Sequence, residues 1–127
     1  MKENEIGSII VDSAVQLHKE LGSGIFENVY EAILMKMLIN KRLHVQRQVI
    51  IPLNFHGDYF DEGFRVDLLV EGKVIIELKS LEKILPVHKK QLLTYLKLSN
   101  IKLGFILNFG AETMKEGIFR IINGFLN

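Results

Sequence analysis

The sequence predicts an α+β domain in which two helices precede a three-stranded antiparallel meander, a third helix and two further strands. Apolar residues recur at helical spacing through the first 40 positions, and short runs rich in Val, Ile, Leu and Phe follow. One more helical stretch then separates two groups of such runs. The chain has 127 residues and no internal repeat, so we treat residues 1–127 as a single domain.

The first two helices are expected over residues 6–21 and 27–40. Apolar residues of the first helix fall on one stripe, which stops at a Gly-Ser-Gly run. The second helix carries Glu27 and Glu31 near its start, four residues apart and on nearly the same side. Acids in the first turn of a helix ordinarily complement the helix dipole, and this explanation is the default for both glutamates.

The remaining elements follow from strand and helix signals. Residues 45–55 are a half-polar strand, and Pro52 within it favours an edge position. A third helix is expected to begin at Pro86 and to end near residue 99. Residues 101–109 and 118–122 are β-branched or aromatic runs typical of strands, although the second is also compatible with a helix.

A predicted hairpin between these elements contains three charged residues inside strands that are otherwise almost wholly apolar: Asp67, Glu77 and Lys79. A three-residue loop at Glu71-Gly72-Lys73 would place Asp67 opposite Glu77, and Arg65 opposite Lys79, on one sheet face. A two-residue loop would separate Asp67 from Glu77 unless a bulge restored the parity. We expect the odd loop or the bulge.

Two carboxylates a few ångströms apart repel each other unless a proton, a cation or a metal ion lies between them. An Asp and Glu pair is suited to Mg²⁺ or Mn²⁺, and Lys79 beside it could position or deprotonate a water molecule, or offset charge on a phosphate. These groups suit hydrolysis of a phosphodiester. The alternative is a surface salt bridge of Lys79 with Glu77 or Asp67, which would contribute little to stability. Burial of such apolar strands in mid-sheet argues against that alternative.

Composition restricts the other classes of function. The absence of cysteine excludes disulfides, thiolate nucleophiles and iron–sulfur clusters, and it fits a reducing, cytoplasmic location. The four histidines show no pair at metal-ligand spacing, which argues against zinc. The net charge of +1 neither demands nor excludes nucleic acid. Near the N-terminus the apolar run is too short for a signal peptide or a membrane span, so no membrane partner is expected.

The run Gly24-Ile25-Phe26-Glu27-Asn28-Val29-Tyr30 resembles the signature of the GxxExxY proteins. That family is grouped with the PD-(D/E)xK nuclease-like superfamily, and the resemblance implies a restriction-endonuclease-like core with one mixed sheet. Further blocks resemble the family in the same order: Arg65–Val70, Ile76–Lys79, His88–Leu96, Leu103-Gly104, Asn108-Phe109 and Gly117–Arg120.

The resemblance also implies a catalytic site. By position, Asp67, Glu77 and the backbone carbonyl of Leu78 would bind Mg²⁺ or Mn²⁺. Lys79 would serve the attacking water, and Glu27 would approach the site from the second helix.

Gln91 and Tyr95 resemble the Gln-x-x-x-Tyr motif of RecB-like members, in which the glutamine helps to organise the site. We also predict that Arg65, Tyr95 and His88 contact substrate, although an exposed histidine in the first turn of a helix is the simpler interpretation of His88. The proline that precedes the aspartate in the superfamily motif is replaced here by Val66.

The leading hypothesis is therefore a metal-dependent nuclease that acts on nucleic acid, with DNA favoured as the substrate. A non-catalytic module that binds nucleic acid or protein on the same fold is the alternative, and an enzyme acting on another phosphate ester is a third. The sequence leaves a homodimer open.

Overall fold

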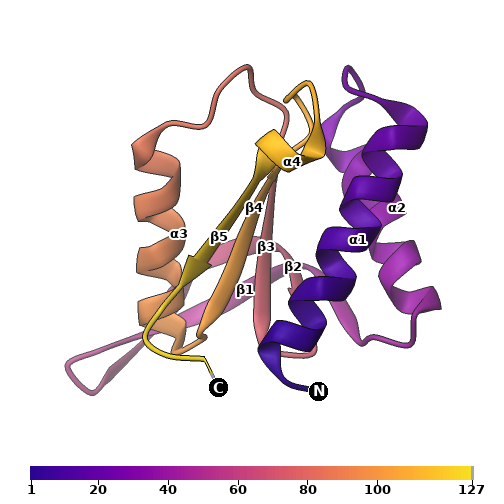
Figure 1. Ribbon diagram of the computed structural model, residues 1–127. Helices are drawn as coiled ribbons and strands as arrows, with labels where there is room; N and C mark the ends of the chain where they lie inside the picture. Colours follow the sequence, from indigo (N-terminus) through magenta and orange to yellow (C-terminus); the bar gives the residue numbers. More distant parts are fainter. Residues whose placement is uncertain (127) are drawn as a thin grey trace.

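The computed structural model describes residues 1–126 and contains a five-stranded sheet with helices on both faces (Figure 1). Strands β1, β2 and β3 form an antiparallel meander, β4 is parallel to β3, and β5 is antiparallel to β4. The predicted α+β class and the meander are confirmed. The elements are α1 (Glu3–Leu21), α2 (Glu27–Asn40), β1 (Val45–Phe55), β2 (Asp58–Val70), β3 (Val74–Lys79), α3 (Pro86–Ser99), β4 (Leu103–Asn108), α4 (Met114–Gly117) and β5 (Ile118–Ile122).

Helices α1 and α2 cover one face of the sheet, and α3 covers the other (Figure 1). Helix α3 is also the crossover that parallel pairing of β3 with β4 requires. Every residue of β4 is buried, as expected for a strand covered on both sides. The α1/α2-side core includes Ile6, Ile10, Leu34, Leu68, Val70, Ile76 and Phe105. The α3-side core includes Val66, Leu69, Ile75, Leu92, Leu96 and Ile106.

The β2–β3 turn confirms the predicted odd loop. Val70 pairs with Val74, so that three residues connect the strands. Glu71 and Gly72 both have positive φ, at 55° and 63°. The edge position of β1 and the strand at 118–122 are confirmed as well. The short helix α4 was not anticipated.

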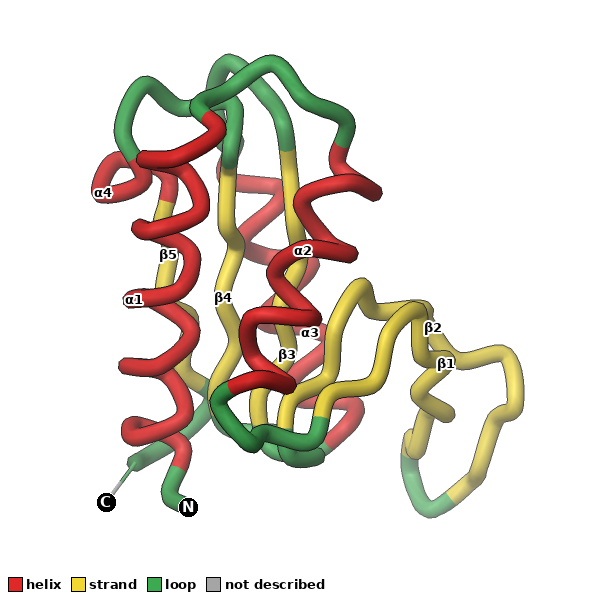
Figure 2. Tube along the Cα trace, turned by 90° about the vertical axis from the view of Figure 1, so that its right-hand side faces the viewer, coloured by secondary structure: helices red, strands yellow, loops and turns green. Residues whose placement is uncertain are grey.

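Strand β2 leaves β3 immediately before Leu68, because the ladder between them contains no pair beyond Leu68 and Ile76. The expected strand pairings of Asp67 with Glu77 and of Arg65 with Lys79 are therefore both wrong. Arg65 instead pairs with Ile50 of β1 and is exposed. From this point the β1–β2 ribbon runs away from the rest of the sheet and projects beyond the helices (Figure 2).

The alternation of β2 side chains between the two faces of the sheet is also interrupted where β2 separates from β3. Val66 packs in the α3-side core and Leu68 in the α1/α2-side core, although strict alternation would place them on one face. Gln48, which lies between the β1 partners of these two residues, has a φ of 52°. Asp67 therefore lies at the point where the ribbon twists. Separately, no helix within residues 1–126 is long and apolar enough to span a membrane.

Candidate active site

Glu77 projects from β3 toward the side of the sheet that α3 covers. It is two residues beyond Ile75, which packs in the α3-side core, and it pairs with buried Ile106 of β4. The side chain is only partly buried, because β2 no longer covers this part of β3. The departure of β2 thus exposes the end of β3 that carries Glu77 and Lys79.

The side chain of Asp67 bonds to the edge of β3 at the point where backbone pairing between β2 and β3 has ended. Its Oδ2 accepts a hydrogen bond from the backbone N–H of Leu78 at 2.8 Å, in place of a strand carbonyl. Its Oδ1 accepts a hydrogen bond from Nε2 of Gln48 at 3.2 Å. These two bonds hold the carboxylate against the edge of β3. The closeness of Asp67 to Glu77 therefore comes from the twist in the ribbon as well as from the odd loop.

The two carboxyl groups interact strongly. The pKa of Glu77 is raised from 4.5 to about 9, by burial first, then by the charge of Asp67 and a hydrogen bond between the two side chains. The charge of Glu31 raises this pKa further, and the charge of Lys79 lowers it. Without a cation at the pair, Glu77 therefore carries a proton at neutral pH.

One oxygen of this pair has no partner. Oε1 of Glu77 is buried and makes no hydrogen bond within the described part of the chain. A buried acceptor without a partner costs free energy, on the order of 1–3 kcal/mol. An unpaired buried polar atom calls for an explanation, and a bound ion is one that fits a carboxylate oxygen.

Lys79 is held at the end of β3 by its backbone. Its carbonyl oxygen accepts a hydrogen bond from the N–H of Phe109 at 2.8 Å, and it pairs with Asn108 of β4. The buried amide of Asn108 in turn binds both backbone groups of Leu81, at 2.9 Å each. The backbone on either side of the lysine is thus fixed, which limits where its ammonium group can lie.

Glu27, the first residue of α2, reaches the same end of β3. Its Oε1 accepts a hydrogen bond from the backbone N–H of Ser80 at 3.0 Å, directly after Lys79. The side chain is exposed and lines an open pocket of about 500 Å³ together with Phe26 and Ser80. Glu27 thus lies at the strand end, but within the described residues it makes no hydrogen bond with Asp67 or Glu77.

Glu31, which lies one turn further along α2, is linked to Asp67 through a shared hydrogen-bond partner, Gln48. It is buried, and its Oε2 forms an ion pair with Nε of Arg47 at 2.5 Å. Its Oε1 accepts a hydrogen bond from Nε2 of Gln48 at 2.9 Å, and the same nitrogen donates to Asp67. Sequence reasoning gave Arg47 and Gln48 no role. A β1–β2 register would have identified Gln48, since its neighbours pair with those of Asp67.

Tyr95 of α3 is affected by the charge of Glu77. Its pKa is raised by burial and then by the charge of Glu77, and its ring stacks on Phe64 at a centroid distance of 4.0 Å. Gln91 precedes it by one turn and is exposed. His88 accepts a hydrogen bond at Nδ1 from the N–H of Leu85 at 2.9 Å, so this ring nitrogen caps the start of α3.

The donor set fits a hard divalent cation. Within residues 1–126 no group of three or more His, Cys, Asp or Glu side chains is arranged to hold a metal ion. Mg²⁺ does not need such a group, because it is usually bound by one or two carboxylates and several waters. Asp67 and Glu77 supply two carboxylates, and the unpaired Oε1 of Glu77 is an oxygen free to bind.

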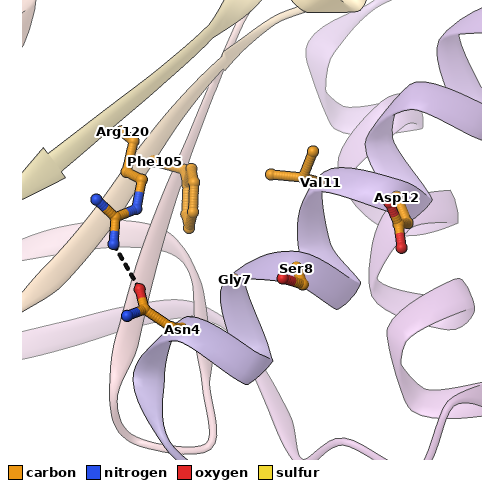
Figure 3. A pocket seen from close by; sticks show the side chains of 7 residues that line it. All are labelled: Asn4, Gly7, Ser8, Val11, Asp12, Phe105 and Arg120. Atoms are coloured by element: carbon orange, nitrogen blue, oxygen red, sulfur yellow. Dashed lines mark hydrogen bonds between the residues drawn. The ribbon is translucent and has the colours of Figure 1, made fainter. Parts of the chain in front are cut away.

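A different hollow, of about 420 Å³, lies between α1 and β5 on the α1/α2 side (Figure 3). Arg120 donates a hydrogen bond to Oδ1 of Asn4 at 2.5 Å across its mouth. Gly7 allows α1 to approach Phe105 closely, since a Cβ atom there would lie 3.1 Å from the ring. Asp12 is its only acid, so this hollow lacks the paired carboxylates found at β3.

A mixed sheet with this order, and an acid pair where β2 leaves β3, defines a restriction-endonuclease-like domain. Residues 4–121 match the PD-(D/E)XK nuclease superfamily, and the chain belongs to it. This membership indicates a nuclease-like function. No curated protein and no solved structure gave a match. The narrower assignment to the GxxExxY proteins stays a prediction.

Proposed function

We propose that this protein is a metal-dependent nuclease that hydrolyses phosphodiester bonds of nucleic acid, with DNA as the favoured substrate. The observation that carries the proposal is the pair of Asp67 and Glu77, which has one buried oxygen without a partner and Lys79 nearby. Superfamily membership supports the same chemistry. The cysteine-free sequence supports the cytoplasm as the location.

Asp67, Glu77 and the carbonyl group of Leu78 would hold Mg²⁺ or Mn²⁺. The N–H of Leu78 donates to Asp67, and the carbonyl of a strand residue points to the same edge as its N–H, which supports the Leu78 oxygen as the third ligand. When bound, the ion would supply positive charge to a phosphodiester under attack. Binding would require Glu77 to lose its proton.

Lys79 would hold the attacking water in line or stabilise charge that develops on the phosphate. The charge of Lys79 lowers the pKa of Glu77, which supports a role for its ammonium group beside the pair. Glu27 would serve the site through Ser80, by fixing the backbone that follows the lysine.

Substrate would approach along α3, which contains lysines and no acidic residue. Tyr95 and Gln91 lie four residues apart on this helix, so the exposed amide of Gln91 lies on nearly the same side as the phenol close to Glu77. We assign Gln91 to the organisation of the site, and Arg65, Tyr95 and His88 to contacts with nucleic acid.

The test is a cleavage assay on plasmid and single-stranded DNA with Mn²⁺, Mg²⁺ or EDTA. We expect cleavage with either metal and none with EDTA. Lys79→Ala should lower the rate roughly 100-fold or more, the scale for loss of one preorganised electrostatic group. Lys36→Ala removes an exposed lysine of α2, outside the proposed substrate path along α3, and serves as the matched control for charge, with a rate close to that of the wild type.

Other outcomes would redirect the assignment. Hydrolysis of small phosphate esters but not of DNA would indicate an enzyme with a different substrate. Metal binding with no hydrolysis of any of these substrates would contradict the nuclease proposal and favour a binding module on the same fold.

A further inference from the structure

Gln48 of β1 joins two carboxylates that come from different elements. Its Nε2 lies 2.9 Å from Oε1 of Glu31 in α2 and 3.2 Å from Oδ1 of Asp67 in β2. An amide nitrogen has two N–H donors and a carboxylate is an acceptor only, so each donor has one matching acceptor. The two acids also fix the orientation of the amide, because its oxygen in this place would face two anions.

The backbone of Gln48 supports a specific role for the side chain. Its φ of 52° lies in the left-handed region, which glycine, asparagine and aspartate adopt far more readily than glutamine. Strained residues of this kind persist where the surrounding structure fixes them, and they cluster at functional sites. Here the strain coincides with the point at which the ribbon twists and aims the amide at Asp67.

Glu31, at the other end of this hydrogen-bonded link, is held by further contacts. Glu31 is buried, and Arg47 binds its second oxygen at 2.5 Å while donating from its guanidinium to the carbonyl of Asn28 at 3.1 Å. The oxygen that faces Gln48 is therefore held in place by α2 and β1 together. An amide bonded to this oxygen has little freedom to turn away from Asp67.

We infer that Gln48 is a positioning residue that anchors Asp67 to Glu31, and thereby holds Asp67 in the orientation in which it binds the divalent cation. The inference rests on the proposed function of the Asp67–Glu77 pair. Gln48 occupies one side of Oδ1 and Leu78 one side of Oδ2, and each carboxylate oxygen keeps a lone pair for the ion.

The test compares the Mn²⁺ dependence of the melting temperature in wild type, Gln48→Leu and Gln48→Gly. Loss of a partner that orients a metal ligand typically weakens metal affinity 10-fold to 100-fold, so both variants should need about 10–100 times more Mn²⁺ for half of the rise in Tm. Gln48→Gly also relieves the left-handed strain, and its metal-free Tm should equal or exceed that of Gln48→Leu.

Gln46→Leu is the matched control. Gln46 lies two residues earlier in the same strand, is exposed, and pairs with Leu69 rather than with an acid. We expect its Mn²⁺ affinity to equal that of the wild type. A residue with a structural role alone would change the metal-free Tm and leave the Mn²⁺ affinity untouched.

The outcomes separate this inference from the proposed function. If the wild type binds Mn²⁺ and both Gln48 variants bind it equally well, the positioning role is wrong and the proposed function stands. If the wild type shows no rise of Tm with Mn²⁺, the proposed function fails and the positioning role fails with it.

Discussion

Glu31 and Glu77 are two acids of low exposure that the fold treats in opposite ways. Glu31 has an ion pair on one oxygen and an amide donor on the other. Glu77 has Asp67 beside it and one buried oxygen with no partner, and its pKa is raised to about 9. The fold is thus able to compensate a buried carboxylate with its own side chains, and it does so at only one of these two positions.

The two acids differ in how far a basic side chain compensates the charge of each. Arg47 projects from β1 onto Glu31 and binds it directly. Lys79 lowers the pKa of Glu77, but burial and the charge of Asp67 outweigh it. A buried charge without a partner is costly, so the pair holds a proton when no other cation is present. This unmet need for positive charge at Glu77 is what the proposed function assigns to a divalent ion.

The largest expected effect comes from adding that ion. At free Mn²⁺ about 100-fold above its Kd, ligand linkage should stabilise the wild type by about 2.7 kcal/mol. Asp67→Asn removes a charged ligand, and the metal-induced rise in Tm should vanish. Lys79→Ala keeps both carboxylates and should retain the rise. Melting curves with and without Mn²⁺ check this, and a rise that persists in Asp67→Asn would remove Asp67 from the site.

A smaller effect should come from removing the charge of each acid in turn. Glu31→Gln loses charge-assisted bonds to Arg47, which should lower the free energy of unfolding by about 1.5–3 kcal/mol. Glu77→Gln replaces an acid that is already neutral at pH 7, so metal-free stability should change little. Urea unfolding at pH 7 measures both. Equal losses from the two substitutions would show that Glu77 is ionised and compensated as Glu31 is.

The raised pKa of Glu77 also predicts a pH dependence. Between pH 4.5 and about 9 the folded protein holds a proton that the unfolded chain releases, so this group's contribution to stability is complete below pH 4.5 and is lost by about pH 9. Without metal, the wild type should lose on the order of 1 kcal/mol per pH unit relative to Glu77→Gln. Unfolding curves at pH 6, 7 and 8 test the slope, and parallel curves would contradict it.

The smallest effect on stability is expected at Gln91, which is exposed on α3. Gln91→Ala should change the free energy of unfolding by less than about 0.5 kcal/mol and leave Mn²⁺ affinity unaltered. The cleavage rate should nevertheless fall about 10-fold if the amide organises the site. Thr94→Ala, an exposed site on the same helix, is the control, and equal rates for both variants would remove Gln91 from the site.

Hydrophobic periodicity and glycine placement are local signals, so the sequence predicted the order of the elements apart from α4, and it offered the odd β2–β3 loop as one of two possibilities. It did not reveal that Val66 and Leu68 face opposite sides, since alternation was assumed along the whole strand. The twist at Gln48 arises from tertiary contacts of two strands, and no local pattern encodes it. For the same reason Glu31 was left with the default explanation of a helix-terminal acid.

The central claim is that a divalent ion replaces the proton of Glu77, and calorimetric titration with Mn²⁺ at pH 7 tests it most directly. Two buffers of different ionisation enthalpy give the number of protons released per ion bound. We predict close to one proton released by the wild type, and none by Glu77→Gln at whatever affinity that variant retains. Binding by the wild type without proton release, or no binding at all, would contradict the claim.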